Sequence, residues 1–547
     1  MNLNKLHITE AVKHLVFLSI LVLTSNSLFA SNYFVAPNGN DTTGTGTINA
    51  PYATIMKANQ YVLPGDTVFL RGGVYQMTDA QINCYYSIWA YMNYMDKSGT
   101  SSKYICYWAY RDEKPIIDMS NVKPAGYRII VFYIRGSYLH FKGLQIIGTQ
   151  VTITTHTQSE CFRNDGGNYN IYEQCSMHDG MAIGFYLTRG MHNLVLNCDA
   201  YNNWDNVSEN QKGGNVDGFG CHPVSSGSVG NVFRGCRAWF NSDDGYDCIN
   251  AYAPVVFDHC WAFYNGYSTS FESLGDGNGF KAGGYGQAPV VSKLPNPIPS
   301  HTVEFCLAYG NKANGIYANH HVQAGDHFYN NTSYHNGINY NMLSQKITKS
   351  PITGNDTTLD CPGFNHVLHN NLSFRYGTQT EVVNMGTCVN TYNSFSPNSG
   401  VTVTADDFLS VDASLLIAPR QADGSLPDIN FLKLKEGSDL IDKGMDLGFS
   451  YNGTAPDLGA FESDYSTTAV PQIISQKSLF FPNPVFNMLN FSLTIKKVQI
   501  YNMTGELMLT AKNTNQMNVS NLKEGVYLMQ FAQSDAKHGT IKFVKTK

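Results

Sequence analysis

The sequence predicts an all-β protein: a right-handed parallel β-helix, followed by a small C-terminal antiparallel β-sandwich. Three observations predict this fold class: the composition, a run of similar segments in the middle of the chain, and a change of pattern near the C-terminus. The 547 residues include 49 glycines and 34 tyrosines, and only 14% of them are charged. Such a composition favours short strands and many turns over helices. The length is compatible with a single repeat unit, because solenoids grow by stacking coils.

The N-terminus has the features of a targeting segment. Lys5 and Lys13 precede an apolar run over 15–23, and a small-residue pattern that ends at Ala30 follows. These features predict a signal peptide over 1–30. The apolar run is shorter than the roughly 20 residues that a spanning helix needs, and no cysteine follows the cleavage site for a lipid anchor. We therefore expect an exported protein without a transmembrane segment, which is secreted, periplasmic or held at the cell surface.

Seven segments of the middle region can be superimposed on one another. Each begins with alternating apolar residues and then has a small or polar residue at one fixed position. That position is occupied by Cys175, Cys198, Cys236, Cys260, Cys306, Asn331 and Asn371. Five residues later, most of the segments have asparagine, at Asn203, Asn241, Asn265, Asn311 and Asn336. Longer spacings between successive members of the cysteine position, such as Cys198 to Cys236, indicate loops inserted into single coils.

A repeat of 23 to 25 residues, as from Cys175 to Cys198, with short strands predicts a parallel β-helix over 31–464, in which equivalent residues of neighbouring coils stack about 4.8 Å apart. Inward asparagines can hydrogen-bond along such a ladder and satisfy the backbone of the turns. The 12 cysteines of an exported chain could instead form disulfides. Their fixed position in the repeat favours a stacked, reduced column in the core. The long face of the stack would offer a groove to an extended polymer.

A second pair of columns follows the cysteine position, about nine residues later where no loop is inserted, and four coils share a glycine there in similar surroundings. If these glycines stack, one column contains Asp217, Asp244, Asn278 and Asn314, and the other contains Gly220, Asp247, Lys281 and Tyr317. Four carboxylates then meet, from Asp217, Asp243, Asp244 and Asp247. They repel one another unless a cation lies among them, and oxygen ligands without histidine or cysteine favour Ca²⁺. The sequence therefore predicts a calcium site, with a solvated acidic turn as the alternative.

Lys281 follows Asp247 by one coil in the same column. An ordinary lysine has a pKa of about 10.4 and is a poor base at neutral pH. Burial and a divalent cation would disfavour its charged form, whereas the carboxylates would favour it. With a metal ion to offset the carboxylates, Lys281 could act as a general base. The glycine-rich run over 275–284 favours a close approach of substrate, and a solvated surface lysine is the alternative.

At these residues the sequence resembles polysaccharide lyase family 9. The resemblance covers most of 31–464 and is most specific at 241–247 (Asn-Ser-Asp-Asp-Gly-Tyr-Asp) and 277–281 (Gly-Asn-Gly-Phe-Lys). It implies a parallel β-helix with an asparagine ladder, Ca²⁺ held by the four aspartates, and Lys281 as the base. The family includes enzymes that act on polygalacturonate and others that act on rhamnogalacturonan I, so the resemblance does not choose the polymer.

The implied reaction is β-elimination on a galacturonate-containing pectic polysaccharide. Calcium would bind the uronate carboxylate and stabilise the enolate-like charge, and Lys281 would remove the proton from C5. The oxygen at C4 would then leave, so that a 4,5-unsaturated uronate end results. The proton for this oxygen could come from water or from a side chain such as Tyr317. His222, His320 and His321 could contact sugar, but a structural or surface role is favoured for each.

The pattern changes after Glu462. A polar linker over 465–477 precedes short alternating runs over 478–547, which predict antiparallel strands. This tail resembles the C-terminal sorting domain of type IX secretion cargo, which implies contact with secretion machinery. A carbohydrate-binding or packing β-sandwich is the alternative.

Two other functions compete with the lyase. A hydrolase of polygalacturonase type also uses a parallel β-helix and paired aspartates, but the Gly-His-Gly and Arg-x-Lys companions of that family are absent. A non-catalytic adhesin or glycan-binding protein would not need Lys281 beside an acidic cluster. The net charge of -6 argues against a nucleic-acid partner. We therefore expect a monomeric, calcium-dependent enzyme whose substrate is a pectic polysaccharide.

Overall fold

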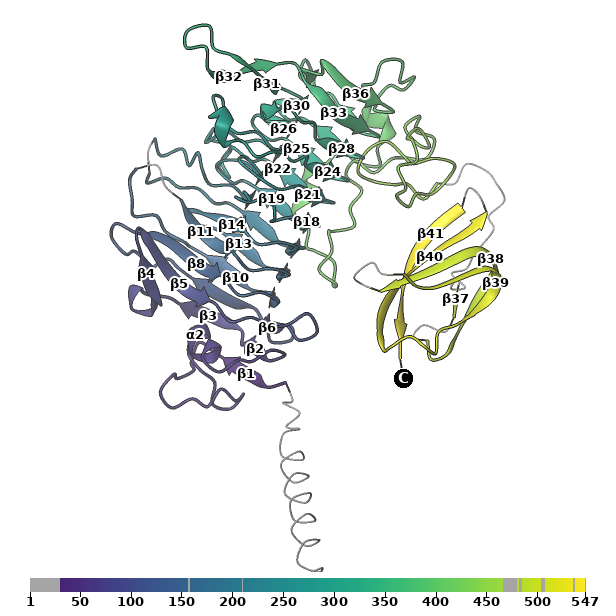
Figure 1. The fold of residues 1–547 in the computed structure, drawn as a ribbon. Helices are drawn as coiled ribbons and strands as arrows, with labels where there is room; N and C mark the ends of the chain where they lie inside the picture. The colour runs from purple at the N-terminus through teal and green to yellow at the C-terminus, as the bar shows by residue number, and fades with distance from the viewer. Residues whose placement is uncertain are drawn as a thin grey trace, which may run out of the picture. The chain divides into compact units, whose positions relative to one another are not determined.

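The computed structural model of the protein describes residues 30–155, 158–208, 210–465, 480–481, 485–502, 507–534 and 537–546. The chain divides into two compact units, with the boundary after Ser466 (Figure 1). The predicted signal peptide lies outside the described residues except for Ala30, and so does nearly all of the predicted linker; both stay predictions. Among the described residues, no helix combines the length and the apolar character that crossing a bilayer requires.

Three long parallel sheets form the first unit (Figure 1). The first sheet contains, in spatial order, β1 (Asn32–Val35), β2 (Thr67–Leu70), β6 (Ile105–Ala109), β9 (Leu139–Lys142), β12 (Ile171–Glu173), β15 (Leu194–Leu196), β18 (Asn231–Arg234), β21 (Val255–Asp258), β24 (Thr302–Glu304), β28 (His327–Tyr329), β33 (Phe364–His369) and β36 (Thr387–Thr391). The second sheet contains β3 (Gly73–Gln76), β7 (Pro115–Asp118), β10 (Gln145–Ile147), β13 (Ser176–His178), β16 (Asp199–Tyr201), β19 (Arg237–Trp239), β22 (Trp261–Phe263), β25 (Leu307–Tyr309), β29 (Thr332–Tyr334) and β34 (Leu372–Phe374).

The third sheet carries the candidate site. It contains β4 (Cys84–Tyr86), β5 (Trp89–Met95), β8 (Arg128–Ile134), β11 (Ser159–Asp165), β14 (Ala182–Arg189), β17 (Phe219–Cys221), β20 (Tyr246–Asp247), β23 (Phe280–Lys281), β26 (Asn314–Tyr317), β30 (Ile338–Asn341) and β35 (Thr380–Val383). All of its pairs are parallel except β4 with β5. Most coils contribute one strand to each sheet, as β12, β13 and β14 do, so the predicted parallel β-helix is confirmed.

The remaining elements of the first unit are short. They are α2 (Ile55–Asn59), the 3₁₀ turns η1 (Asp79–Gln81), η2 (Val291–Lys293), η3 (Ala405–Asp407) and η4 (Ala413–Ile417), and a small sheet of β27 (His321–Val322), β31 (Ser344–Lys349) and β32 (Asp356–Cys361).

The cysteine column marks the turn from the first sheet to the second. The residue directly before most of its members has left-handed backbone without being glycine, as at His259 (φ 53°) and Phe305 (φ 52°). Bulky residues adopt this conformation only where the surroundings enforce it. The following thiols are buried and donate to carbonyls of the preceding coil, for example Cys306 Sγ to Phe257 O at 3.4 Å. All 12 cysteines are free, so the reduced column is confirmed over the disulfide alternative.

The predicted asparagine ladder follows the second sheet. The side-chain amide of each member donates to the amide oxygen of the next, over 3.0 Å from Asn203 to Asn241 and 3.1 Å from Asn241 to Asn265. Each amide also satisfies a main-chain carbonyl of the coil before, such as Ala238 O from Asn265 at 3.0 Å. The ladder is therefore confirmed, and it provides the hydrogen bonds that the buried turns would otherwise lack.

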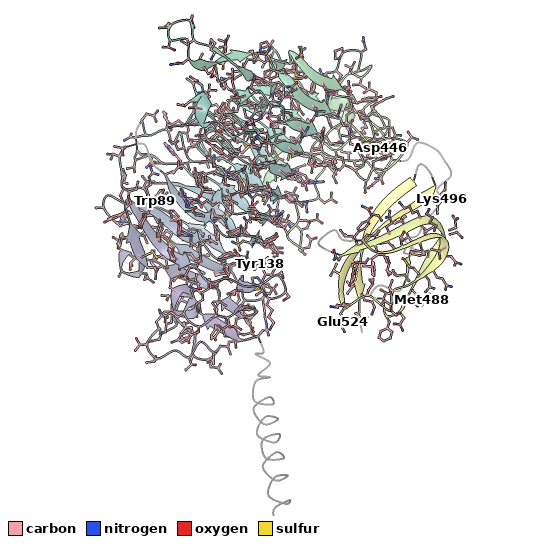
Figure 2. All side chains as sticks on the ribbon, viewed as in Figure 1. Trp89, Tyr138, Asp446, Met488, Lys496 and Glu524 are labelled. Atoms are coloured by element: carbon pink, nitrogen blue, oxygen red, sulfur yellow. The ribbon has the colours of Figure 1, made fainter. Side chains whose placement is uncertain are left out.

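Aromatic side chains also stack between neighbouring coils. Tyr138, labelled in Figure 2, stacks on Tyr169 with ring centroids 5.1 Å apart, and Tyr169 stacks on His192 at 4.9 Å. The segment of the first unit that contains η3 and η4 covers the outer side of the second sheet. Arg237 and Arg420 both bind Asp199 there. Burial would raise the pKa of Asp199, but the two guanidinium groups outweigh it and lower this pKa.

The second unit is an antiparallel sheet with its own apolar core. Its strands are β37 (Phe480–Phe481), β38 (Met488–Asn502), β39 (Leu507–Asn518), β40 (Gly525–Ser534) and β41 (Lys537–Lys545). The long strand β38 pairs with β37, β39 and β40. Val498, Ile500, Met529 and Phe543 belong to the core. The antiparallel C-terminal domain predicted from the sequence is confirmed.

Candidate metal centre and active site

Strand register in the third sheet brings the predicted site residues together. Gly220 of β17 pairs with Asp247 of β20, Asp247 pairs with Lys281 of β23, and Lys281 pairs with Tyr317 of β26. Parallel pairing places such partners on the same face of the sheet. The column derived from the glycine alignment is therefore present in the structure.

The neighbouring column is a hydrogen-bonded ladder that changes from asparagine to aspartate. Asn314 Nδ2 donates to Asn278 Oδ1 at 2.7 Å, and Asn278 Nδ2 donates to Asp244 Oδ1 at 2.7 Å. The backbone N–H of Asp244 in turn donates to Asp217 Oδ1 at 3.1 Å. Asp244 and Asp217 thus each have one carboxylate oxygen fixed by the ladder. The other oxygen of each can face the remaining aspartates.

The four aspartates form one buried acidic cluster. Oxygens of Asp217, Asp243 and Asp244 lie within 4.8 Å of one another, and an oxygen of Asp247 lies within the same distance of Asp217. All four residues are at most 6% exposed. The Oδ2 atom of Asp244 is buried, and its contact is the Lys281 ammonium at 3.0 Å.

Burial and mutual repulsion make this cluster unstable as four free charges. Burial raises the pKa of Asp217 well above its usual range, and the charges of Asp243, Asp247 and Asp244 add to the effect. Burial likewise raises the pKa of Asp243, with Asp244 as the largest charge contribution. Because the four side chains offer only hard carboxylate oxygens, and these are buried close to one another, the residues fit a calcium ion.

Lys281 is the cation that faces the cluster. Its Nζ lies 3.0 Å from Asp244 Oδ2 and 3.1 Å from Asp247 Oδ2, and the side chain is 12% exposed. Burial lowers the pKa of Lys281, but the four aspartates together outweigh it and raise this pKa well above its ordinary value. In the metal-free protein Lys281 is therefore protonated. The prediction of a partly neutral lysine requires a divalent cation to offset the aspartates.

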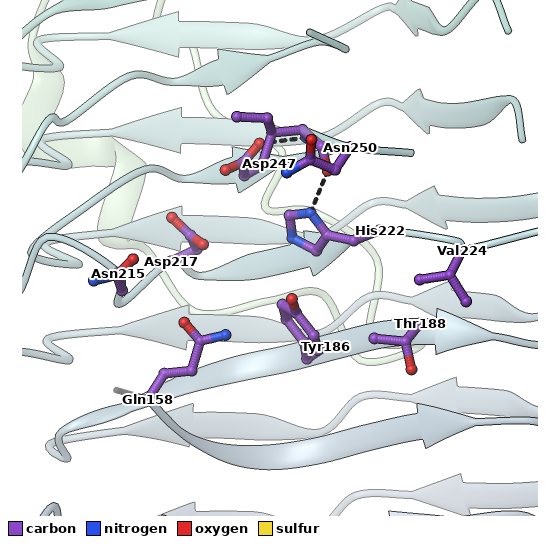
Figure 3. A pocket seen from close by; sticks show the side chains of 10 residues that line it. Gln158, Tyr186, Thr188, Asn215, Asp217, His222, Val224, Asp247 and Asn250 are labelled. Atoms are coloured by element: carbon purple, nitrogen blue, oxygen red, sulfur yellow. Dashed lines mark hydrogen bonds between the residues drawn. The ribbon is translucent and has the colours of Figure 1, made fainter. Parts of the chain in front are cut away.

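A cavity of about 250 Å³ adjoins the cluster on the side of the preceding coil (Figure 3). Its lining residues are Gln158, Tyr186, Thr188, Asn215, Asp217, His222, Val224, Asp247, Ile249 and Asn250. The His222 ring lies beside Tyr186, with ring centroids 4.7 Å apart, and its Nδ1 donates to Ile249 O at 2.6 Å. Sequence reasoning favoured a structural role for His222 and missed Tyr186, because the two residues come from different coils and share no motif.

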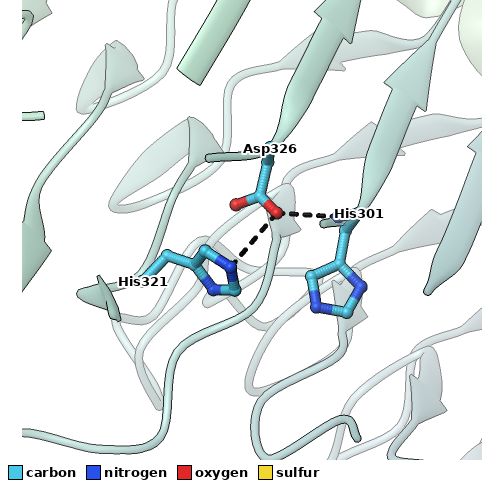
Figure 4. A group of neighbouring side chains, drawn as sticks. All are labelled: His301, His321 and Asp326. Carbon is cyan, nitrogen blue, oxygen red and sulfur yellow. Dashed lines mark hydrogen bonds and ion pairs between the residues drawn. The ribbon is translucent and has the colours of Figure 1, made fainter. Parts of the chain in front are cut away.

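The other histidines named from the sequence have different surroundings. His320 Nδ1 pairs with Asp360 at 2.9 Å, while His321 is fully buried. His321 belongs to a second polar cluster with His301 and Asp326 (Figure 4). The amide of Val255 donates to His301 Nδ1, and that of Gly284 donates to His321 Nδ1. Both rings must therefore carry their proton on Nε2, so neither Nε2 offers a lone pair to a metal ion.

Comparisons with known proteins agree with this architecture. Residues 33–371 match the family model described as Pel9A-like, right-handed β-helix region. Residues 479–546 match the secretion system C-terminal sorting domain. The chain is 32% identical over 452 residues to pectate lyase L of Dickeya dadantii (strain 3937), which covers 80% of this chain and 92% of that protein.

Two solved structures are similar over most of the chain. A rhamnogalacturonan lyase superimposes with a TM-score of 0.70 at 44% identity, over 74% of this chain and 97% of that one. The crystal structure of pectate lyase Pel9A superimposes with a TM-score of 0.61 at 31% identity, over 80% of this chain and 98% of that one. The right-handed form of the β-helix, predicted from the sequence, is the form that the matching family has.

Proposed function

This chain belongs to the Pel9A-like right-handed β-helix family, and from that premise we propose that it is a lyase of pectic polysaccharides that requires calcium and uses Lys281 as its base. The observation that carries the proposal is the contact of Lys281 with Asp244 and Asp247, at 3.0 and 3.1 Å, inside a cluster of four buried carboxylates. The pectate lyase and rhamnogalacturonan lyase relatives support elimination as the reaction.

Asp217, Asp243, Asp244 and Asp247 are the residues that would hold the calcium ion. A bound calcium ion would supply positive charge that holds the uronate carboxylate and offsets the aspartates. The ladder from Asn314 through Asn278 keeps Asp244 oriented. The backbone amide of Asp276 donates to Asp243 Oδ1 at 2.7 Å and orients that side chain in the same way.

Lys281 Nζ would take the proton from C5 of the uronate. The electron pair of that C–H bond would form the C4–C5 double bond, and the oxygen at C4 would leave with the other part of the polymer. The column position of Lys281 between Asp247 and Tyr317 directs its side chain to the outer face of the sheet, where an extended polymer can lie.

Tyr317 is the side chain in the column that can return a proton to the leaving oxygen. Burial raises its pKa to about 12, so the hydroxyl keeps its proton at neutral pH. Water is the alternative donor. A Tyr317→Phe variant should lose at least tenfold in kcat if the hydroxyl donates, whereas a change below threefold would assign the donation to water.

The second unit supports export of the enzyme. Its match to a secretion system C-terminal sorting domain favours recognition by secretion machinery, followed by release or retention at the cell surface. A pectic polymer is too large to be taken up intact, so action outside the cell suits the proposed substrate.

The proposal is tested with purified protein and pectic polymers. With calcium, ultraviolet absorbance of unsaturated uronate should rise with time, and a chelator should stop the rise until calcium is added back. Reducing ends without this absorbance would show that the enzyme is a hydrolase. Absence of any product from every pectic polymer, with binding retained, would instead support a non-catalytic glycan-binding protein.

A further inference from the structure

A second pocket opens at the turns that join the second sheet to the third. Its volume is about 460 Å³, which lies within the range of about 300 to 1,000 Å³ that is typical of ligand sites. None of its lining residues belongs to the acidic cluster, to the column of Lys281 or to the cavity beside the cluster. Its lining includes the side chains that define it below as the turn pocket: Tyr264, Tyr267, Phe271, Lys312, His335 and Gln379.

A glycine opens the turn pocket. The residue before each of four ladder asparagines has left-handed backbone, and this position is occupied by Phe240 (φ 51°), Tyr264 (φ 58°), Gly310 (φ 61°) and His335 (φ 59°). Of these four residues, only Gly310 lacks a side chain, and a Cβ atom there would lie 2.9 Å from the Tyr264 ring. Gly310 therefore leaves a gap in a column whose other three members carry rings.

Aromatic side chains form one wall of the turn pocket. Phe271 lies edge-on to Tyr264 with ring centroids 5.2 Å apart, and the ring of Tyr267 lies 5.9 Å from that of Phe271. Phe271 is nevertheless 56% exposed. An exposed ring at the mouth of a pocket offers an apolar surface to the C–H face of a sugar.

Lys312 gives the turn pocket a positive charge that no acid balances. Its ammonium donates to the main-chain carbonyls of Leu274, at 2.9 Å, and Gly275, so the third N–H remains for a ligand. Within the described part of the chain, no carboxylate forms an ion pair with Lys312. The lining contains neither aspartate nor glutamate, and burial lowers the pKa of His335, which keeps this ring neutral at pH 7. A carboxylate bound here would meet an unopposed cation.

The turn pocket is elongated along the stack of coils. Four successive coils contribute to its lining, from Tyr264 after β22 to Gln379 before β35. At the usual strand spacing, four coils extend over about 14 Å. This length suits a stretch of polysaccharide better than a single sugar.

We propose that the turn pocket is a second, non-catalytic binding site for uronate-containing polysaccharide, in which the rings hold sugar faces and Lys312 pairs with a carboxylate. The choice of ligand rests on the proposed function, whereas the pocket itself needs neither calcium nor Lys281. A polymer held both here and at the acidic cluster would bind more tightly than at either site alone, because the second contact is intramolecular.

One loop connects the two sites. Phe271 and the two carbonyls that Lys312 holds belong to it, and so does Asp276, whose backbone N–H donates to Asp243 Oδ1 at 2.7 Å. The pocket and the acidic cluster therefore lie at opposite sides of the same loop, so a test must separate sugar binding from effects on calcium.

The first experiment measures sugar binding by calorimetry on the full-length protein in chelator. Without calcium the four aspartates repel a uronate, so binding at the acidic cluster is suppressed. The probes are trigalacturonate, the same trimer with its carboxylates reduced to alcohols, and free galacturonate. Trigalacturonate should bind at least fivefold more tightly than either of the others.

Equal affinity for the reduced trimer would overturn the uronate contact, and equal affinity for free galacturonate would overturn the elongated site. Absence of binding by all three probes, while elimination proceeds with calcium, would overturn the turn pocket and keep the lyase. Absence of elimination with trimer binding retained would instead overturn the proposed function.

Two variants locate the binding in the turn pocket. Phe271→Asn removes the ring and suits the left-handed backbone of this position (φ 61°), and Lys312→Met removes the charge but keeps the length of the side chain. Each should weaken trigalacturonate binding at least fivefold. The matched controls are Tyr86→Asn and Lys123→Met, at exposed positions outside the pocket, and trimer binding that is equal in variants and controls would overturn the assignment.

Calcium affinity of the same variants separates a sugar contact from support of the loop. It should stay within about threefold of the natural protein in both Phe271→Asn and Lys312→Met. Loss of calcium affinity in Lys312→Met, with trimer binding unchanged in Phe271→Asn, would make Lys312 a support of the loop and overturn its contact with the sugar. With calcium, Phe271→Asn should also raise KM for the polymer at least fivefold with kcat within twofold; an unchanged KM would contradict the second contact.

Discussion

Replacement of Lys281 by methionine should separate two effects of its ammonium group, catalysis and competition with calcium. The Nζ atom lies 3.0 Å from Asp244 and 3.1 Å from Asp247, and the side chain is 12% exposed. At an effective dielectric constant of about 20, unit charges at this distance interact by roughly 5 kcal/mol. A cation that binds the same carboxylates must weaken these contacts.

Lys281→Met removes the competing charge but keeps the length of the side chain. Only part of the Coulomb energy appears as net affinity, because the ammonium regains water when it is displaced. We expect calcium to bind at least tenfold more tightly, which corresponds to about 1.4 kcal/mol. Elimination should fall by roughly 10²- to 10⁴-fold, the usual contribution of a general base.

The assay pairs calorimetric titration of calcium with the absorbance of unsaturated uronate. Lys281→Arg is the matched control, because it keeps the positive charge but cannot lose its proton near neutral pH. Its calcium affinity should stay within about threefold of the natural protein while its activity is lost. Calcium binding that is no tighter in Lys281→Met would refute the competition, and activity above one tenth of the natural level would refute the base assignment.

Three further predictions concern pH, the ladder and the thiols. Burial raises the pKa of Asp217 in the folded state, so the metal-free protein is destabilised in full above that pKa, and the destabilisation fades as the pH falls from that pKa to the ordinary value of an aspartate. Asp217→Asn should therefore be more stable than the natural protein in chelator at pH 8, with an advantage that disappears toward pH 4 in denaturation curves. Asn265→Ala should cost about 3 kcal/mol in the free energy of unfolding, because its buried amide bonds Ala238, Asn241 and Asn311, whereas Asn430→Ala, at an exposed position outside the left-handed region, should cost almost nothing. Without reductant, all 12 thiols should react with a thiol reagent after denaturation, and reductant should leave the melting temperature unchanged; fewer thiols would indicate disulfides.

Much of the candidate site was accessible from the sequence because a β-helix repeats its register. The cysteine position defines the coils, and alignment of the glycine that four coils share then places Asp247 next to Lys281, although an inserted loop changes their offsets from the cysteine. The structure has this pairing. The roles of the four aspartates and of Lys281 stay predictions until calcium binding and elimination are measured.

The sequence by itself determined the repeat, the columns and the acidic residues that belong to them, since these depend only on spacing along the chain. Tertiary structure decided which histidines have a free acceptor, how Lys281 is paired, and what lines the cavity beside it. His222 Nε2 is an acceptor only because the carbonyl of Ile249, from the next coil, binds Nδ1. Such properties arise from contacts between side chains and main-chain groups of different coils and inserted loops, which no regular spacing encodes.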